Sequence, residues 1–136
     1  MTRRAATLLE LLLALSILGV VLALGLAQVG RGLQHAALRE TQAVVLVALD
    51  AARGSAVRLG EPVALSHQAP LLRVVGGTAT LWRRLVGAPT ATLDGLGSAI
   101  RFGPAGIGLG FANRTLRIHG GADTVTVVLS RLGRIR

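Results

Sequence analysis

Hydrophobic and polar positions divide the chain into an apolar N-terminal stretch and a region of short alternating segments. Residues 11–27 read LLLALSILGVVLALGLA, in which Ser16 is the one polar side chain. Extended to residues 6–29, the stretch makes a helix of about 36 Å at about 1.5 Å per residue. A bilayer core is about 30 Å thick. Residues 6–29 are therefore long enough to span a membrane as a helix.

Beyond this stretch the pattern predicts that the helix continues to about residue 58. Apolar residues recur close to one helix face, at Leu33, Ala37, Val44, Ala48 and Ala52. No proline interrupts residues 6–58, and Gly60 with Pro62 ends the helix. We expect residues 6–29 to lie in lipid and residues 30–58 to pack against a domain.

From residue 59 to residue 136 the period becomes two, which predicts short β-strands. The expected strands are 62–66, 71–75, 78–86, 98–102, 115–119 and 124–130. Residues 87–97 and 103–113 are rich in Gly and Pro and are predicted to be loops. So short a β-region has a thin core, which the outer half of the helix would complete. The predicted fold is α+β, with a long N-terminal helix, transmembrane and then amphipathic, packed on an antiparallel β-sheet domain.

Composition supports a membrane segment and gives no sign of an enzyme. Of 136 residues, 51% are hydrophobic and 15% are charged, which excludes intrinsic disorder. The absence of cysteine excludes disulfides and thiol chemistry. His35, His67 and His119 lack the spacing of a metal motif, and no G-x-S-x-G sequence is present. We expect no catalytic activity and no cofactor.

Two further features are interpreted as structural. The glycines at 103, 106, 108 and 110 do not match G-x-G-x-x-G and do not open a helix, so we expect loop and strand-edge glycines there. Trp82 stands beside two arginines, and we expect it to be a core or interface residue.

Glu10 is the one charge within residues 6–29. A carboxylate in lipid costs up to about 2.5–3.5 kcal/mol at the bilayer centre and less near an end, so such a residue is a functional candidate. Arg3 and Arg4 should stay cytoplasmic, and they would have to fold back to reach Glu10. A cation of another chain, or a newly exposed α-amino group, is the better partner, because buried charges are tolerated as pairs.

The N-terminal segment RRAATLLE at 3–10, followed by the apolar run, resembles type IV pilins and pseudopilins. The resemblance implies that a prepilin peptidase removes residues 1–5 by cutting between Ala5 and Ala6, where the family usually has Gly and Phe. Ala6 then carries a free amine that is methylated, and Glu10 becomes the fifth residue. The resemblance further implies that Thr7 and Glu10 serve assembly, with Glu10 neutralising the amine of a neighbouring subunit.

Later segments are similar to the GspH/FimT family of minor pilins and pseudopilins. They are AARGSAV with GEPVAL at 51–65, FGPAG at 102–106 and SRLGRIR at 130–136. This resemblance implies a minor subunit of a type IV pilus or of a type II secretion pseudopilus, whose partners are other pilin subunits. Such a chain would cross the inner membrane once, with a cytoplasmic N-terminus, before it enters the fibre.

The basic residues indicate a second activity. All fifteen are arginines, against six acidic residues, and Arg131, Arg134 and Arg136 lie at the end of the chain. Chain ends are often mobile, so we expect a mobile tail. One guanidinium group can bind two phosphate oxygens at once, so we expect this tail to contact double-stranded DNA. The ending Gly133-Arg134-Ile135-Arg136 is also similar to the tail associated with DNA binding in FimT-type pilins of natural transformation. The alternative is that these arginines only solvate the last strand or meet acidic neighbours in the fibre.

Two other interpretations of the whole chain stay open. One is a type II secretion minor pseudopilin of the same fold. The other is a secreted β-protein released by signal peptidase after Ala27, since Gly25-Leu26-Ala27 fits a small-x-small site. The length of the apolar run and the presence of Glu10 within it argue against a signal peptide.

Overall fold

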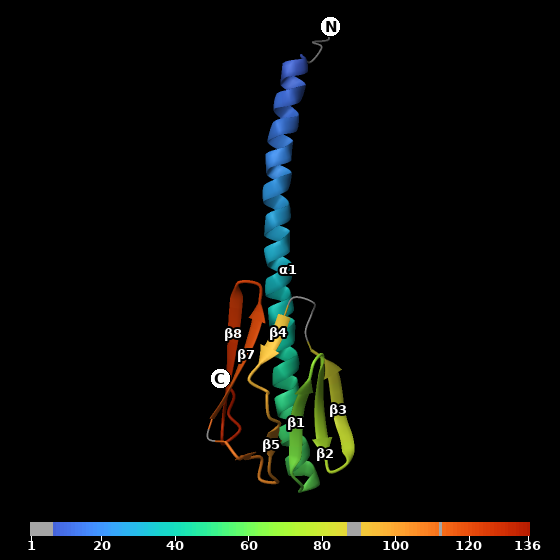
Figure 1. The fold of residues 1–136 in the computed structure, drawn as a ribbon, viewed down its shortest axis with the longest axis vertical. Coiled ribbons are helices and arrows are strands. Elements are labelled where there is room, and N and C mark those ends of the chain that lie inside the picture. The colour runs from blue at the N-terminus through green and yellow to red at the C-terminus, as the bar shows by residue number, and fades with distance from the viewer. Residues whose placement is uncertain (1–6, 87–90, 112) are drawn as a thin grey trace. The chain divides into compact units, whose positions relative to one another are not determined.

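The computed structural model describes residues 7–86, 91–111 and 113–136. They form one long helix, α1 (Leu8–Leu59), followed by eight strands (Figure 1). The strands are β1 (Val63–Gln68), β2 (Leu71–Gly76), β3 (Ala79–Leu85), β4 (Ala91–Asp94), β5 (Ile100–Phe102), β6 (Gly108–Leu109), β7 (Asn113–Gly120) and β8 (Asp123–Ser130). This arrangement confirms the predicted α+β fold. The chain divides into two compact units, an N-terminal unit (Met1–Leu33) and a globular unit (Gln34–Arg136).

In the N-terminal unit, α1 has an uncovered apolar surface. Every side chain that the structure describes from Thr7 to Leu33 is exposed, and Leu9 is 78% exposed. The helix is long and apolar enough to cross a membrane. Monomeric soluble proteins rarely expose contiguous apolar patches of this extent. This surface therefore needs lipid or other protein chains around it.

The strands of the globular unit form two sheets. One has the order β3-β2-β1-β5-β6 and the other the order β4-β7-β8. All pairings are antiparallel, and β1 and β2 pair from Val63 with Gly76 to Gln68 with Leu71. Figure 1 shows β1, β2 and β3 side by side, and the C-terminus beside β7 and β8. The β-region thus combines hairpins between consecutive strands with two pairings between strands further apart in the sequence, β1 with β5 and β4 with β7.

Both sheets and α1 share one hydrophobic core. The helix contributes Leu38, Val44, Val45, Ala48, Leu49, Ala52 and Ala56. Alternate residues of the strands complete it, among them Val63, Leu65, Leu72, Val74, Ile100, Phe102, Leu116, Ile118, Val127 and Leu129. Trp82 is partly buried and packs against this core, as the sequence analysis expects. The buried alanines of α1 allow the strands to approach the helix closely.

The helix ends where the sequence predicts. Gly60 adopts a φ of +67°, the left-handed conformation that favours glycine after a helix. Its amide donates a hydrogen bond to the Ala56 carbonyl at 3.1 Å. Pro62 follows and has no N–H with which to continue the helix. The chain then enters β1.

Three details of the prediction are wrong. β4 lies within 87–97 and β6 lies within 103–113, both of which were expected to be loops. These strands are short, and they form because β7 and β5 offer them a partner edge. Leu33 does not belong to the packing face of α1, because it is 67% exposed.

Replacing Leu49 with alanine tests the packing of α1 on the sheets. Leu49 is 1% exposed in the core, so the free energy of unfolding should fall by about 2–5 kcal/mol. This free energy is measured by denaturant unfolding of the full chain in detergent, with the fluorescence of Trp82 as the signal. Val47→Ala is the control, because Val47 is 53% exposed on the same helix; it should change stability by about 0.5 kcal/mol or less. Equal losses would contradict the packing described.

Candidate functional site

The first turn of α1 contains a reciprocal pair of hydrogen bonds between Thr7 and Glu10. The Thr7 amide donates to Glu10 Oε2 at 2.9 Å, and the Glu10 amide donates to Thr7 Oγ1 at 3.3 Å. The Thr7 hydroxyl also donates to Oε2 at 3.2 Å. This is a capping box, in which two amides that the helix leaves unpaired are satisfied by side chains. The spacing T-x-x-E signals this motif in the sequence and gives Glu10 a structural role beside the charge predicted to be functional.

The capping box fixes the Glu10 carboxylate at the start of the apolar helix. Oε2 accepts both hydrogen bonds from Thr7. Over the residues that the structure describes, no hydrogen bond reaches Oε1. The predicted cleavage and methylation site, Ala5 and Ala6, lies outside the residues that the structure describes.

The second candidate site is the C-terminal segment, residues 131–136, which turns back along β8. Gly133 makes the turn with a φ of +76°, and its amide donates to the Ser130 carbonyl at 2.9 Å. Arg136 and Val128 exchange two backbone hydrogen bonds, of 2.9 and 2.8 Å. The expectation of a mobile tail is therefore wrong. Backbone pairing with the edge of β8 holds the segment in place.

Arg53 of α1 holds the turn of the C-terminal segment from the other side. Its Nη1 donates to the Gly133 carbonyl at 3.3 Å. A Cβ atom on Gly133 would lie 3.0 Å from Arg53 Nε, and one on Gly106 would lie 3.1 Å from it. The Arg53 side chain thus fits closely against two glycine backbones. This role of Arg53 is not predictable from the sequence, because the two partners of the hydrogen bond are 80 positions apart.

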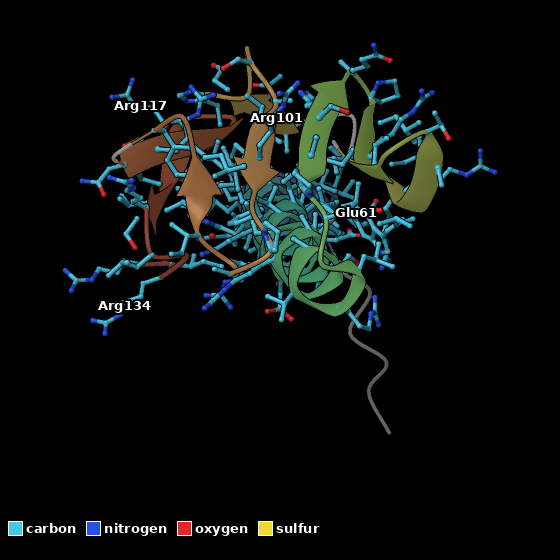
Figure 2. All side chains as sticks on the ribbon, turned by 90° about the horizontal axis from the view of Figure 1, so that it is seen from below. Glu61, Arg101, Arg117 and Arg134 are labelled. Carbon is cyan, nitrogen blue, oxygen red and sulfur yellow. The ribbon has the colours of Figure 1, made fainter. Side chains whose placement is uncertain are left out.

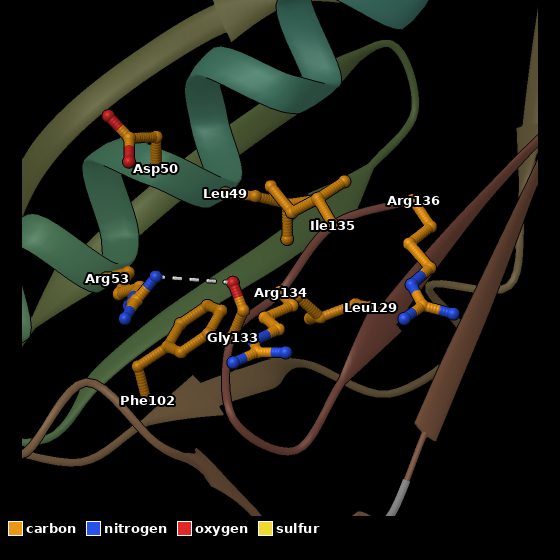
Figure 3. A pocket seen from close by; sticks show the side chains of 9 residues that line it. All are labelled: Leu49, Asp50, Arg53, Phe102, Leu129, Gly133, Arg134, Ile135 and Arg136. Carbon is orange, nitrogen blue, oxygen red and sulfur yellow. Dashed lines mark hydrogen bonds between the residues drawn. The ribbon is translucent and has the colours of Figure 1, made fainter.

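An open pocket of about 380 Å³ lies beside this contact (Figure 3). Its lining combines apolar and charged side chains: Leu49, Phe102, Leu129, Ile135, Asp50, Arg53, Arg134 and Arg136, with Gly133 at the turn. Figure 3 shows the Arg53 guanidinium directed at the Gly133 carbonyl. One carboxylate among three guanidinium groups leaves the pocket with a net positive charge.

The structure brings the candidate DNA-contacting residues together on the C-terminal segment. The side chains of Arg131, Arg134 and Arg136 are exposed, whereas Gly133 is buried at the turn. Figure 2 shows Arg134 projecting away from the strands. Within the described residues, none of the three guanidinium groups forms an ion pair with a carboxylate. Their charges are available to an anionic partner.

Two histidines pair with aspartates. His35 Nδ1 lies 3.4 Å from Asp123 Oδ2, and His119 Nε2 lies 3.3 Å from Asp94 Oδ2. These pairs occupy two of the acidic groups of the globular unit. Over residues 7–86, 91–111 and 113–136, no group of three or more histidine or acidic side chains is placed to hold a metal ion.

The glycine-rich stretch does not form a phosphate cradle. The amides of Gly103, Gly106 and Gly108 donate to the carbonyls of Ile107, Gly103 and Arg131, at 2.9, 2.8 and 2.7 Å. These amides already have partners within the protein, so they are not available to a phosphate. The last of them ties β6 to the start of the C-terminal segment.

Comparisons with known proteins agree with this architecture. No protein-family model and no curated protein matches the chain. Among solved structures, it is similar to the type IV minor pilin FimU of Pseudomonas aeruginosa strain PAO1 in two crystal forms. In the first form the TM-score is 0.57, with 21% identity over 75% of this chain and 90% of FimU. In the second form it is 0.59, with 20% identity over 78% and 88%. The fold is that of a type IV pilin.

Removing the Arg53 side chain should loosen the C-terminal segment. The variant Arg53→Ala loses one hydrogen bond to Gly133, worth about 1 kcal/mol. Hydrogen exchange of the Gly133 and Arg136 amides should therefore become about fivefold faster. Arg58→Ala is the matched control, because Arg58 lies on the same helix and its one hydrogen bond to a described residue goes to Ser55, three residues away. Unchanged exchange in Arg53→Ala, or equal acceleration in both variants, would contradict the role of Arg53.

Proposed function

We propose that the chain is a minor type IV pilin that enters, or primes, a pilus. The supporting observation is an uncovered apolar helix, with one carboxylate in its first turn, on a globular unit of pilin fold. Lipid covers the apolar surface before assembly, and the corresponding helices of other subunits cover it in the fibre. The protein acts as a structural subunit, and no step of this function needs catalysis.

The proposed maturation follows from the N-terminal sequence. Prepilin peptidase cuts between Ala5 and Ala6 and removes the leader, residues 1–5. Residues 6–29 then anchor the chain in the inner membrane, with the N-terminus on the cytoplasmic side. Residues 30–58 and the β-rich part, 59–136, lie outside. The new amine of Ala6 is methylated, which leaves its positive charge in place.

Glu10 provides the specificity of assembly in this proposal. A lone carboxylate in lipid is unfavourable, and a cation from the next subunit relieves that penalty. The α-amino group of Ala6 in a neighbouring subunit is such a cation. Thr7 holds Glu10 Oε2 in the capping box, which leaves Oε1 for the incoming amine. The pair therefore forms only when two helices meet at the correct depth.

Contact with double-stranded DNA during natural transformation is the second proposed role. It is supported by the exposed arginines of the C-terminal segment, none of which forms an ion pair with a carboxylate of the described residues. Arg131, Arg134 and Arg136 would bind phosphates, and Gly133 would shape the turn that presents them. Binding of this kind is largely independent of sequence and weakens steeply with salt.

Two substitutions of Glu10 separate its charge from its capping role. Glu10→Ala removes both, whereas Glu10→Gln removes the charge and keeps a side chain that can complete a capping box. If the charge pair drives assembly, both variants should insert into the membrane and both should be lost from fibres, by at least about tenfold. The amount of each variant in sheared fibres and in membranes, measured by immunoblot, gives the result.

Glu40→Gln, a change at an exposed acid of the globular unit, is the control and should enter fibres normally. Normal entry of Glu10→Gln would show that capping, and not charge, is required. Mass spectrometry of the N-terminus checks the premise. A chain that starts at a methylated Ala6 supports the proposal, and a chain that starts at Gln28 overturns it in favour of a secreted protein.

The DNA role of the C-terminal segment is tested by replacing Arg131, Arg134 and Arg136 together with glutamine. Each phosphate contact contributes about 0.9 to the slope of log affinity against log salt. Loss of three contacts should lower that slope by about 2.7, as measured by fluorescence anisotropy of a labelled duplex with the full chain in a nonionic detergent. An unchanged affinity and slope would reject this role.

A further inference from the structure

The five-stranded sheet has an arginine-bearing face that the proposed function does not use. Its strands contain Arg73 on β2, Arg83 and Arg84 on β3, and Arg101 on β5. The same five strands contain no aspartate and no glutamate. The acidic residues of the globular unit lie instead on α1, before β1, or in the three-stranded sheet, where Asp94 and Asp123 pair with histidines.

The pairing register places three of these arginines on one face. Arg73 pairs directly with Arg83 on one side and with Ser66 of β1 on the other. Ala64, two residues before Ser66 and so on the same face, pairs with Arg101. All three arginines are exposed, whereas their neighbours along each inner strand, such as Leu72 and Ile100, are buried. Figure 2 shows Arg101 on the side of the strands that faces away from α1.

The outward face of an antiparallel sheet is normally polar, but this does not require arginines directly opposite each other. Like charges directly opposite each other on neighbouring strands are destabilising, and Arg73 and Arg83 are such a pair. Charged residues often protect an edge strand from unwanted pairing, which could account for Arg83 on β3. It does not account for Arg73 or Arg101, because β2 and β5 are inner strands of the sheet.

The small side chains between the arginines allow a partner to approach this face of the sheet closely. The β1 residues that separate Arg73 from Arg101 on this face are Ala64 and Ser66, which have small side chains. Neighbouring strands lie about 4.8 Å apart, so the row from β3 to β5 is about 14 Å wide. A DNA duplex presents one phosphate charge per about 1.7 Å of its length, or about eight charges over this width. None of the three guanidinium groups has an ion-pair partner in the part of the globular unit that the structure describes.

We propose that this face, formed by Arg73, Arg83 and Arg101, is a second contact surface for the phosphate backbone of double-stranded DNA. The inference extends the DNA role proposed for the C-terminal segment, but it depends on different residues. Guanidinium groups from two sides of β1 bind phosphate oxygens while the small β1 side chains keep the backbone close to the sheet. The contact is electrostatic and independent of base sequence.

The test compares three variants of the full chain in nonionic detergent, each with three arginines replaced by glutamine. The face variant changes Arg73, Arg83 and Arg101. The segment variant changes Arg131, Arg134 and Arg136. The control variant removes the same charge elsewhere, at Arg39 and Arg58 of α1 and at Arg84, which pairs with the buried Leu72 and so lies on the opposite face from Arg83.

Affinity for a labelled duplex is measured by fluorescence anisotropy between 50 and 200 mM salt. Each phosphate contact accounts for about a 3.5-fold change in affinity over that range. In the face variant, the change in affinity between 50 and 200 mM salt should therefore be about 40-fold smaller than in the unchanged chain. In the control variant this change should be almost unaltered. Circular dichroism of each variant checks that the fold is retained.

The outcomes separate this inference from the proposed role of the segment. If the affinity for the duplex and its salt-dependent change fall in the face variant but not in the segment variant, the inference is supported and the DNA role of the segment is rejected. A loss in the segment variant alone overturns the inference and leaves the segment role intact. An equal loss in face and control variants also overturns it, because net charge would then explain binding. Binding of polyglutamate is measured in the same way. If it binds through Arg73, Arg83 and Arg101 as tightly as the duplex does, the inference is also overturned, since the partner would then be an acidic protein surface.

Discussion

An apolar helix surface that its own unit does not cover is the constraint on which the rest of this structure depends. From Thr7 to Leu33 every described side chain is exposed, and such a surface is not stable in water. Lipid and the apolar surfaces of other protein chains are the two environments that can cover it. In the proposed function, a single carboxylate within that surface gives the helix a preferred depth and a preferred neighbour, which uniform apolar packing alone would not supply. The capping box adds a local reason for the same residue, because Glu10 also completes the first helical turn.

In the globular unit the same helix has a different role, because it completes the hydrophobic core. Its strands are too short to enclose a core among themselves, and one face of α1, from Leu38 to Ala56, supplies the missing layer. Both sheets pack on that face and share a single core. The opposite face of this part of the helix keeps exposed apolar residues such as Val47 and Val57. One side of this part of the helix is thus a core element, and the other side is a surface that other protein chains can contact, as the proposed function requires.

The sequence predicts those parts of this fold that depend on local pattern. The length of α1, its end at Gly60 and six of the strands follow from periodicity and turn residues. β4 and β6 could not be predicted, because strands of four and two residues exist only through the edges they pair with. For the site, Glu10 is evident as a charge in an apolar run. The contact between Arg53 and Gly133 is not evident, because it joins residues 80 positions apart without a recognisable motif.

The fixed C-terminal segment changes how its arginines could meet an anion. In a mobile tail, each arginine must lose both backbone and side-chain freedom on binding, and this entropy opposes association. Here the turn at Gly133 and the pairing of Arg136 with Val128 fix the backbone in advance, so only the side chains remain to be ordered. A fixed backbone also limits which phosphates the arginines can reach together. In the proposed DNA contact, affinity would then depend on the fit between the spacing of the arginines and that of the phosphates. The proposed second face would extend this contact, which a short rigid segment cannot extend by itself.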